Sequence, residues 1–110
     1  MTVVPAERCL ALYSQDDWKA LCGRLETVER TPQRRRFERF LSEHTVEAVS
    51  CDSQGRLLVL PSQREFAQIG REVVTIRTES RVEIWAKDRY EAQRMSDDEA
   101  AAYSDEAGFF

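Results

Sequence analysis

The chain has 110 residues, of which 42% are hydrophobic and 33% charged, with a formal net charge of −4. This composition predicts one small globular domain and excludes a disordered or fibrous chain. The longest apolar run, at 57–60, is too short to cross a bilayer, and the first residues have no secretory-signal pattern.

The charges are unevenly distributed along the chain. Residues 96–110 contain five acidic and no basic residues, so the rest of the chain carries +1, and 14 of the 16 basic residues are arginine. Arginine suits bidentate contacts to phosphate and guanine, although a coding bias would give the same composition. The three cysteines, Cys9, Cys22 and Cys51, are widely spaced. They predict small core residues and a reducing cytoplasm rather than disulfides or a zinc site, and we expect no cofactor.

The first half of the chain predicts two helices. Residues 14–27 have Ser14 as a candidate N-cap and one apolar face formed by Trp18, Leu21, Cys22 and Leu25. A second helix is predicted to start near Pro32 and to end near His44, because proline suits the first turn of a helix. Its core face contains Phe37, Phe40 and Leu41.

The second half predicts mainly strands. We expect strands at 46–49 and 57–60, the latter buried, joined by a turn with Asp52 at its first position and Gly55 at its fourth. A short helix over 61–67, strands at 72–78 and 81–85, and a helix over 87–95 follow. The acidic segment 96–110 shows no apolar periodicity, so we expect it to be mobile.

An internal repeat appears when the chain is shifted by 72 residues. Residues 6–21 then align with 78–93 without a gap, and each segment is an alternating strand, an aromatic, an acid and a helix. The alignment predicts one shared core for Leu10, Leu12, Val82 and Ile84. A hairpin with its own Asp and Arg precedes the second copy only, so by symmetry we expect a missing first hairpin.

The ordered blocks resemble the MraZ family of the SpoVT-AbrB group. The blocks that carry the resemblance are CLALYSQDDW at 9–18, RRRFERFL at 34–41, DSQGRLLVLPSQREFA at 52–67, REVVTI at 71–76 and RVEIWAKDRYEA at 81–92. The similarity covers residues 4–95. It implies four parts: a remnant of a first repeat at 1–28, an arginine-rich helix at 29–44, a second repeat at 45–95 and an acidic tail at 96–110.

The resemblance implies an α+β fold of swapped β-hairpins, interleaved into a small barrel with flanking helices. It also implies a bacterial, nucleoid-associated repressor of the division and cell-wall gene cluster. Such a regulator is expected to form a ring-like homo-oligomer on double-stranded DNA with tandem repeat boxes. The family's first Asp-x-x-x-Arg signature has no counterpart in this chain, which leaves the second, at 52–56.

The residues of the second signature explain how it could contact DNA. Asp52 can accept hydrogen bonds from the turn and orient Arg56, while Gly55 permits a positive φ. With Ser53 and Gln54 between them, these residues form a candidate DNA-binding tip. From the five residues alone, an ordinary hairpin with a solvated ion pair is the other interpretation.

Arg35 and Arg39 are further candidates for DNA binding. They share one face of the predicted second helix and could follow phosphates. The same face could instead be solvated or lie between subunits.

Two other classes of protein are alternatives to a DNA-binding regulator. An enzyme is disfavoured, because His44 is the only histidine and no catalytic motif is visible. A protein-interaction module of the antitoxin type, completed by another chain, is the alternative. Its supporting features are the missing hairpin and the terminal Phe109 and Phe110.

Overall fold

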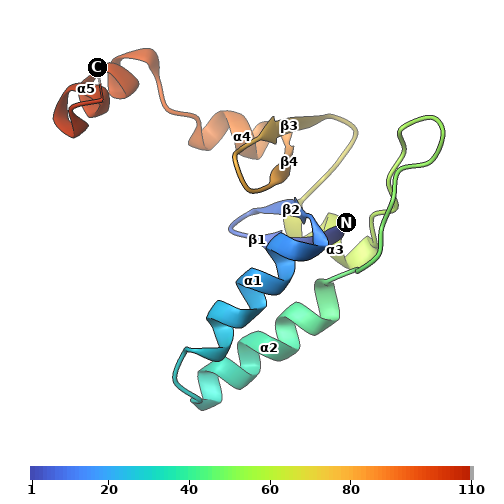
Figure 1. The fold of residues 1–110 in the computed structure, drawn as a ribbon. Coiled ribbons are helices and arrows are strands. Elements are labelled where there is room, and N and C mark those ends of the chain that lie inside the picture. The colour runs from blue at the N-terminus through green and yellow to red at the C-terminus, as the bar shows by residue number, and fades with distance from the viewer. Residues whose placement is uncertain (110) are drawn as a thin grey trace.

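The computed structural model describes residues 1–109, which form an α+β fold with four strands and five helices (Figure 1). Phe110 lies outside the described residues. The elements are β1 (Thr2–Ala6), β2 (Cys9–Tyr13), α1 (Gln15–Glu26), α2 (Pro32–His44), α3 (Pro61–Ala67), β3 (Val73–Arg77), β4 (Val82–Ala86), α4 (Lys87–Gln93) and α5 (Asp97–Ala107). The strands form one antiparallel sheet in the order β1-β2-β4-β3. Within residues 1–109 the sheet is open at β1 and β3 and does not close into a barrel.

The sheet has an internal two-fold arrangement that follows the 72-residue shift. Thr2 pairs with Tyr13 in the first hairpin, and Val74 pairs with Trp85 in the second, so the two registers are equivalent. At the junction, Ala11 lies opposite Glu83, its own equivalent. We call β1, β2 and α1 the first unit, and β3, β4 and α4 the second unit.

The aromatic pairs of the two units are also equivalent. The ring centroids of Tyr13 and Trp18 lie 6.1 Å apart, and those of Trp85 and Tyr90 lie 6.2 Å apart. In each unit the pair joins the end of a strand to the helix that follows it. The repeat found in the sequence therefore corresponds to a repeated packing unit.

One face of the sheet carries the main core. Leu10 pairs with Ile84 and Leu12 with Val82, and all four side chains contribute to one hydrophobic cluster. This confirms their predicted common core. The cluster is covered by α3 and by side chains from 46–60, whereas α1 packs Trp18 and Leu21 against the other face.

Local signals set the helix boundaries as predicted. The Ser14 Oγ accepts a hydrogen bond from the Asp17 amide at 3.1 Å, and Thr31 caps α2 in the same way, with Pro32 at the first position. His44 ends α2. The two helices form a hairpin that extends away from the sheet (Figure 1).

Two predicted strands are wrong. Val46 forms an isolated bridge to Val3, and Val49 exchanges hydrogen bonds with Met1, but the positive φ of Ala48, 57°, interrupts a regular strand between them. Residues 57–60 form no strand. Leu57 and Val59 pack on the core, but the segment has no ladder partner within residues 1–109, and Leu58 is 67% exposed.

Two elements were not predicted from the sequence. The first is β1, whose proline is tolerated because β1 is an edge strand. The acidic segment, expected to lack regular structure, contains α5. There the Ser96 Oγ accepts from the Glu99 amide at 3.1 Å, and the Glu99 carboxylate accepts from the Ser96 amide at 3.3 Å. This capping box and the acidic first turn favour a helix.

No helix within residues 1–109 is long and apolar enough to span a bilayer. The same residues contain no cluster of three or more histidine, cysteine or carboxylate side chains that could hold a metal ion.

Candidate nucleic-acid interface

The Asp52–Arg56 turn lies at the end of an arm, residues 47–60, that projects from the body (Figure 1). The Gly55 amide donates to the Asp52 carbonyl at 3.0 Å, and the Asp52 amide donates to the Arg56 carbonyl at 2.9 Å. Gly55 has a φ of +77°, which the sequence analysis predicted and which favours glycine. The predicted turn is therefore confirmed, although its flanks do not form strands.

The Asp52 carboxylate organises this turn. Its Oδ1 accepts from the amides of Gln54 and Arg56 at 2.9 and 2.8 Å, and its Oδ2 accepts from the Arg56 Nε at 2.8 Å. Hydrogen bonds from the Arg56 backbone and side chain, with a smaller one from Gln54, lower the pKa of Asp52. The carboxylate stays ionised at neutral pH and fixes the direction of the guanidinium.

The Arg56 guanidinium is open to solvent beyond this contact. Its side chain is 74% exposed, and within residues 1–109 its two terminal nitrogens have no hydrogen-bond acceptor. Ser53 and Gln54 are exposed at the same tip. The arm therefore presents a preoriented arginine with free donors.

Arg35 and Arg39 do not join this surface. Both are exposed on α2 and line a shallow groove with Glu38, Ser42 and Glu43. The start of α2 and the end of the arm lie at opposite ends of the molecule (Figure 1). The two carboxylates in the groove reduce its positive charge.

The base of the arm is anchored by a residue that the sequence analysis did not select. Gln63 is fully buried in α3; its Nε2 donates to the carbonyls of His44 and Val3 at 2.7 and 3.3 Å. Its Oε1 accepts from the Leu60 amide at 3.0 Å. This side chain fixes the end of the arm to α2 and β1. The signal in the sequence was the glutamine at the third position of a proline-initiated helix.

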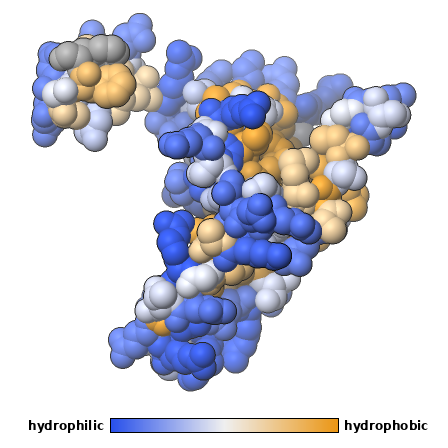
Figure 2. Space-filling model, viewed as in Figure 1, coloured by the Kyte–Doolittle hydropathy of each residue, from blue (hydrophilic) through white to orange (hydrophobic). Residues whose placement is uncertain are grey.

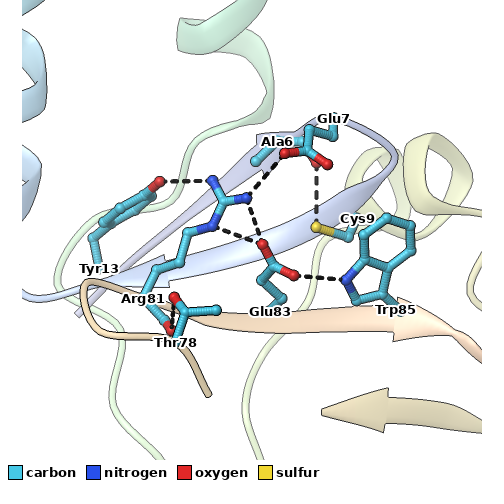
Figure 3. Close-up of polar contacts among 8 residues, drawn as sticks. All are labelled: Ala6, Glu7, Cys9, Tyr13, Thr78, Arg81, Glu83 and Trp85. Atoms are coloured by element: carbon cyan, nitrogen blue, oxygen red, sulfur yellow. Dashed lines mark hydrogen bonds and ion pairs between the residues drawn. The ribbon is translucent and has the colours of Figure 1, made fainter. Parts of the chain in front are cut away.

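A second polar cluster was also missed, and it joins the two units (Figure 3). Arg81 donates to the Tyr13 hydroxyl at 3.0 Å and to the Glu7 carboxylate at 3.3 Å, and it forms a close ion pair with Glu83. The Trp85 Nε1 donates to the other Glu83 oxygen at 3.0 Å. Strand alternation places positions 81, 83 and 85 on one face, which was the available signal.

Arg81 is a structural cation rather than a candidate for DNA binding. Burial opposes its charge, but the hydrogen bonds to Tyr13 and Glu83 outweigh burial and raise the pKa of Arg81 above its ordinary value. Only 19% of its side chain is exposed, and three side chains already occupy its donors. The exposed arginine of the arm is therefore the better candidate for an external ligand.

The family model described as "MraZ protein, putative antitoxin-like" matches residues 41–108, which is more than half of the chain. The chain belongs to the MraZ family. The matched region contains the arm, the second unit and α5, so the MraZ similarity extends past residue 95, where we expected it to end. Arg35 and Arg39 lie outside that region.

Several curated relatives, each named "Transcriptional regulator MraZ", agree with this assignment. The relative from Marinomonas sp. (strain MWYL1) is 33% identical over 86% of this chain and 62% of its own length. The relative from Caldanaerobacter subterraneus subsp. tengcongensis is 39% identical over 84% and 64%, and that from Pelotomaculum thermopropionicum is 42% identical over 76% and 57%. The chain therefore spans about three fifths of the length of these MraZ relatives.

Proposed function

We propose that this chain is a DNA-binding transcriptional regulator of the MraZ type and that the Asp52–Arg56 turn contacts DNA. The observation that carries the proposal is the exposed Arg56 guanidinium, held by the Asp52 carboxylate at 2.8 Å. The names of the curated relatives support the same class of function. In this proposal the protein is not an enzyme and works in the cytoplasm, at the nucleoid.

The proposed mechanism uses the free side of the Arg56 guanidinium. Asp52 holds the Nε, so the terminal nitrogens can donate to the O6 and N7 of a guanine, or to a phosphate. A good bidentate contact to guanine discriminates against other bases by about 1–3 kcal/mol. Ser53 and Gln54 add polar groups at the same tip. Asp52 is a positioning residue, since its oxygens already accept hydrogen bonds from the turn.

One arginine per chain gives a weak contact, so we include self-association in the proposal. A ring-like homo-oligomer on tandem repeat boxes would bind several boxes at once, which gains on the order of 10²–10⁴ in avidity. Arg35 and Arg39, which are exposed on α2 apart from the tip, would provide a second, sequence-independent contact to phosphates. A repressor of the division and cell-wall gene cluster is the expected role.

We also propose how the arm would be completed. Residues 47–60 form no ladder within the described chain. The outer edge of β3 is open, and the edge at β1 is paired only locally, by Val46 with Val3 and by Val49 with Met1. A swapped-hairpin barrel, in which such arms interleave, would pair these backbone groups. In the proposed organisation, 1–28 belongs to a first repeat and 45–95 to a second, with the helix at 29–44 between them and the acidic tail at 96–110.

A protein-interaction module of the antitoxin type, completed by another chain, is the second candidate. One observation favours it: Leu58, beside the turn, is 67% exposed, which suits a protein partner better than DNA. DNA makes mainly polar and charged contacts with proteins.

Fluorescence anisotropy tests the first candidate. The probe is a duplex with tandem repeats from the region upstream of the gene, compared with a scrambled duplex. Arg56→Ala should lower affinity for the native duplex at least tenfold and leave the melting temperature unchanged, because the side chain is exposed. Arg71→Ala, at another exposed arginine, is the matched control.

Equal affinity of the parent chain for native and scrambled DNA would contradict specific regulation by this chain. An Arg56→Ala variant that binds as well as the parent would remove the proposed contact residue. If DNA binding is absent while Leu58→Ser abolishes capture of a defined protein partner, the antitoxin-type module is favoured instead.

A further inference from the structure

The base of the arm determines where the Asp52–Arg56 turn lies relative to the body. The Asp52 carboxylate orders the turn itself, but the turn is at the far end of the arm (Figure 1). Figure 2 shows that this end is hydrophilic and that hydrophobic residues lie between it and the body. A small rotation at the base displaces the Arg56 guanidinium by a larger distance. A constant position of Arg56 therefore requires a base that is held in one conformation.

The chain enters the arm through two residues that are paired by their backbones. Val46 exchanges hydrogen bonds with Val3 at 2.8 and 2.9 Å. The Val49 amide donates to the Met1 carbonyl at 2.7 Å, and the Val49 carbonyl accepts from the Met1 amino group at 2.9 Å. The entry of the arm is thus fixed to the start of β1.

The chain leaves the arm without such pairing. Within residues 1–109, neither the amides nor the carbonyls of 57–59 form a hydrogen bond. Leu57 and Val59 pack on the core, but apolar contacts are non-directional and do not fix the path of the backbone. The first hydrogen bond after the turn is that of the Leu60 amide, which donates to the Gln63 Oε1 at 3.0 Å. The direction of the exit therefore depends on Gln63.

The same side chain also reaches the entry of the arm. The Gln63 Nε2 donates at 2.7 Å to the carbonyl of His44, which directly precedes the entry, and at 3.3 Å to the carbonyl of Val3, the partner of Val46. A side-chain amide has one acceptor oxygen and two N–H donors, so it satisfies one amide and two carbonyls at once. An ionised carboxylate or an apolar group of the same size cannot do so. Gln63 is 0% exposed, so no water replaces these contacts.

We propose that Gln63 is a positioning residue for the DNA contact, because its amide joins the exit of the arm to its entry and so fixes the direction in which Arg56 is presented. The inference rests on the proposed function of the turn. It concerns the arm of a single chain and needs no contact between copies. Preordering a contact residue reduces the entropy that is lost on binding. Gln63 is buried at the base and cannot touch DNA, so its effect on affinity must pass through the arm.

Distances between two spin labels test this role without DNA. One label is attached to the native, exposed Cys51 of the arm. The other is attached to Lys19→Cys, at an exposed position of α1, in a chain that also carries Cys22→Ser. Cys9 stays unlabelled, since it is fully buried and burial, with smaller effects of nearby charges, raises its pKa to about 12. Double electron–electron resonance on samples diluted with unlabelled chain measures the distance within one chain.

The test variant is Gln63→Met, which keeps the length of the side chain and removes its amide. The distribution of distances should become at least about twofold wider than in the parent, because the exit of the arm loses its hydrogen bond to the body. Thr31→Ala removes the cap at the other end of α2 and is the matched control for a general loss of stability. It should leave the width unchanged. A Gln63→Met distribution as narrow as that of the parent would overturn the proposal.

Amide hydrogen exchange of the parent chain supplies a test that needs no variant of Gln63. The Leu60 amide should exchange at least about tenfold more slowly than the amides of 57–59, since only the Leu60 amide is hydrogen-bonded within the described residues. Similar exchange rates at all four positions would show that Gln63 does not hold the exit, whether or not Gln63→Met folds.

Fluorescence anisotropy with the native duplex connects the base of the arm to DNA binding. Gln63→Met should lower the affinity of the parent at least about fivefold, and it should have no further effect in a chain that already carries Arg56→Ala, because it acts through that arginine. Equal losses in the two backgrounds would overturn the positioning role. If Arg56→Ala binds as well as the parent, the proposed function of the turn fails, whereas the spin-label distances still decide whether Gln63 orders the arm.

Discussion

The two units have equivalent hydrogen-bond registers but different environments. All five residues of β2 are buried, whereas β3 alternates between exposed and half-buried residues and β4 is buried only at its end. Helices α1, α2 and α3 and part of the arm pack on β1 and β2, whereas α4 packs on β3 and β4, and β4 also contributes Val82 and Ile84 to the cluster under α3. The alternating sequence therefore determines the register, and the segments that pack on the sheet determine how much each strand contributes to stability.

The largest expected effect compares two residues that pair across the junction of the units. Leu10 is fully buried and Ile84 half-buried. Leu10→Ala should lower the free energy of unfolding by about 2–5 kcal/mol, and Ile84→Ala should cost clearly less, because part of its side chain already contacts water. Urea denaturation measures both. Equal losses would show that the difference in burial does not determine stability.

The next effect concerns the polar cluster that joins the units. Arg81→Met should cost about 1.5–3 kcal/mol, since hydrogen bonds to charged groups have this magnitude and the Glu83 carboxylate would lose its cation. Arg77→Met, at an exposed position of β3, is the control and should cost less than about 0.5 kcal/mol. Thermal unfolding followed by tryptophan emission measures both changes. If both variants lose the same stability, the cluster does not hold the units together.

A smaller effect distinguishes the two unit helices. Ser14 caps α1 through its hydroxyl, whereas its equivalent Ala86 gives α4 no side-chain cap. Ser14→Ala should cost about 0.5–2 kcal/mol. Ser42→Ala, inside α2, removes a hydroxyl without removing a cap. Chemical denaturation of the two variants should separate them, and similar midpoints would argue against a capping contribution.

The smallest effect on global stability is expected in the arm. The pKa of Asp52 is lower in the folded chain than its unfolded value near 3.9. The contribution of the Asp52 carboxylate to the stability of the turn is therefore present above the unfolded pKa and is lost as pH falls through the folded pKa. Amide resonances of Gln54 and Arg56 should therefore shift below about pH 3.9. Nuclear magnetic resonance can follow them during an acid titration, with Asp52→Asn as the control. Shifts centred above pH 4 would contradict the hydrogen-bonded carboxylate.

Features that depend on neighbouring residues were predictable from the sequence. The caps of α1 and α2 and the Asp52–Arg56 turn each depend on a few consecutive residues. The 72-residue spacing was enough to predict the common core of Leu10, Leu12, Val82 and Ile84, because it needs no knowledge of the path between the copies. The turn was thus predicted together with the orientation of Arg56.

Features that depend on distant segments were not predictable in this way. The apolar run at 57–60 fits a buried strand and an irregular cover equally well, and only the absence of a ladder partner decides between them. The separation of Arg35 from Arg56 depends on the direction of the helical hairpin. Arg81 meets Tyr13 across 68 positions of sequence, so local patterns did not reveal their contact.

The pairing of Ala11 with its own equivalent Glu83 has a consequence for the order of folding. Both hairpins close over short distances, whereas the β2–β4 contact must close a loop of about 72 residues, which is slower because of its entropy. Until that contact forms, β2 of one molecule can pair with β2 or β4 of another molecule at low geometric cost, since the pairing edges of β2 and β4 are equivalent. Refolding at high concentration should therefore yield domain-swapped dimers, and dilution should favour the intramolecular sheet.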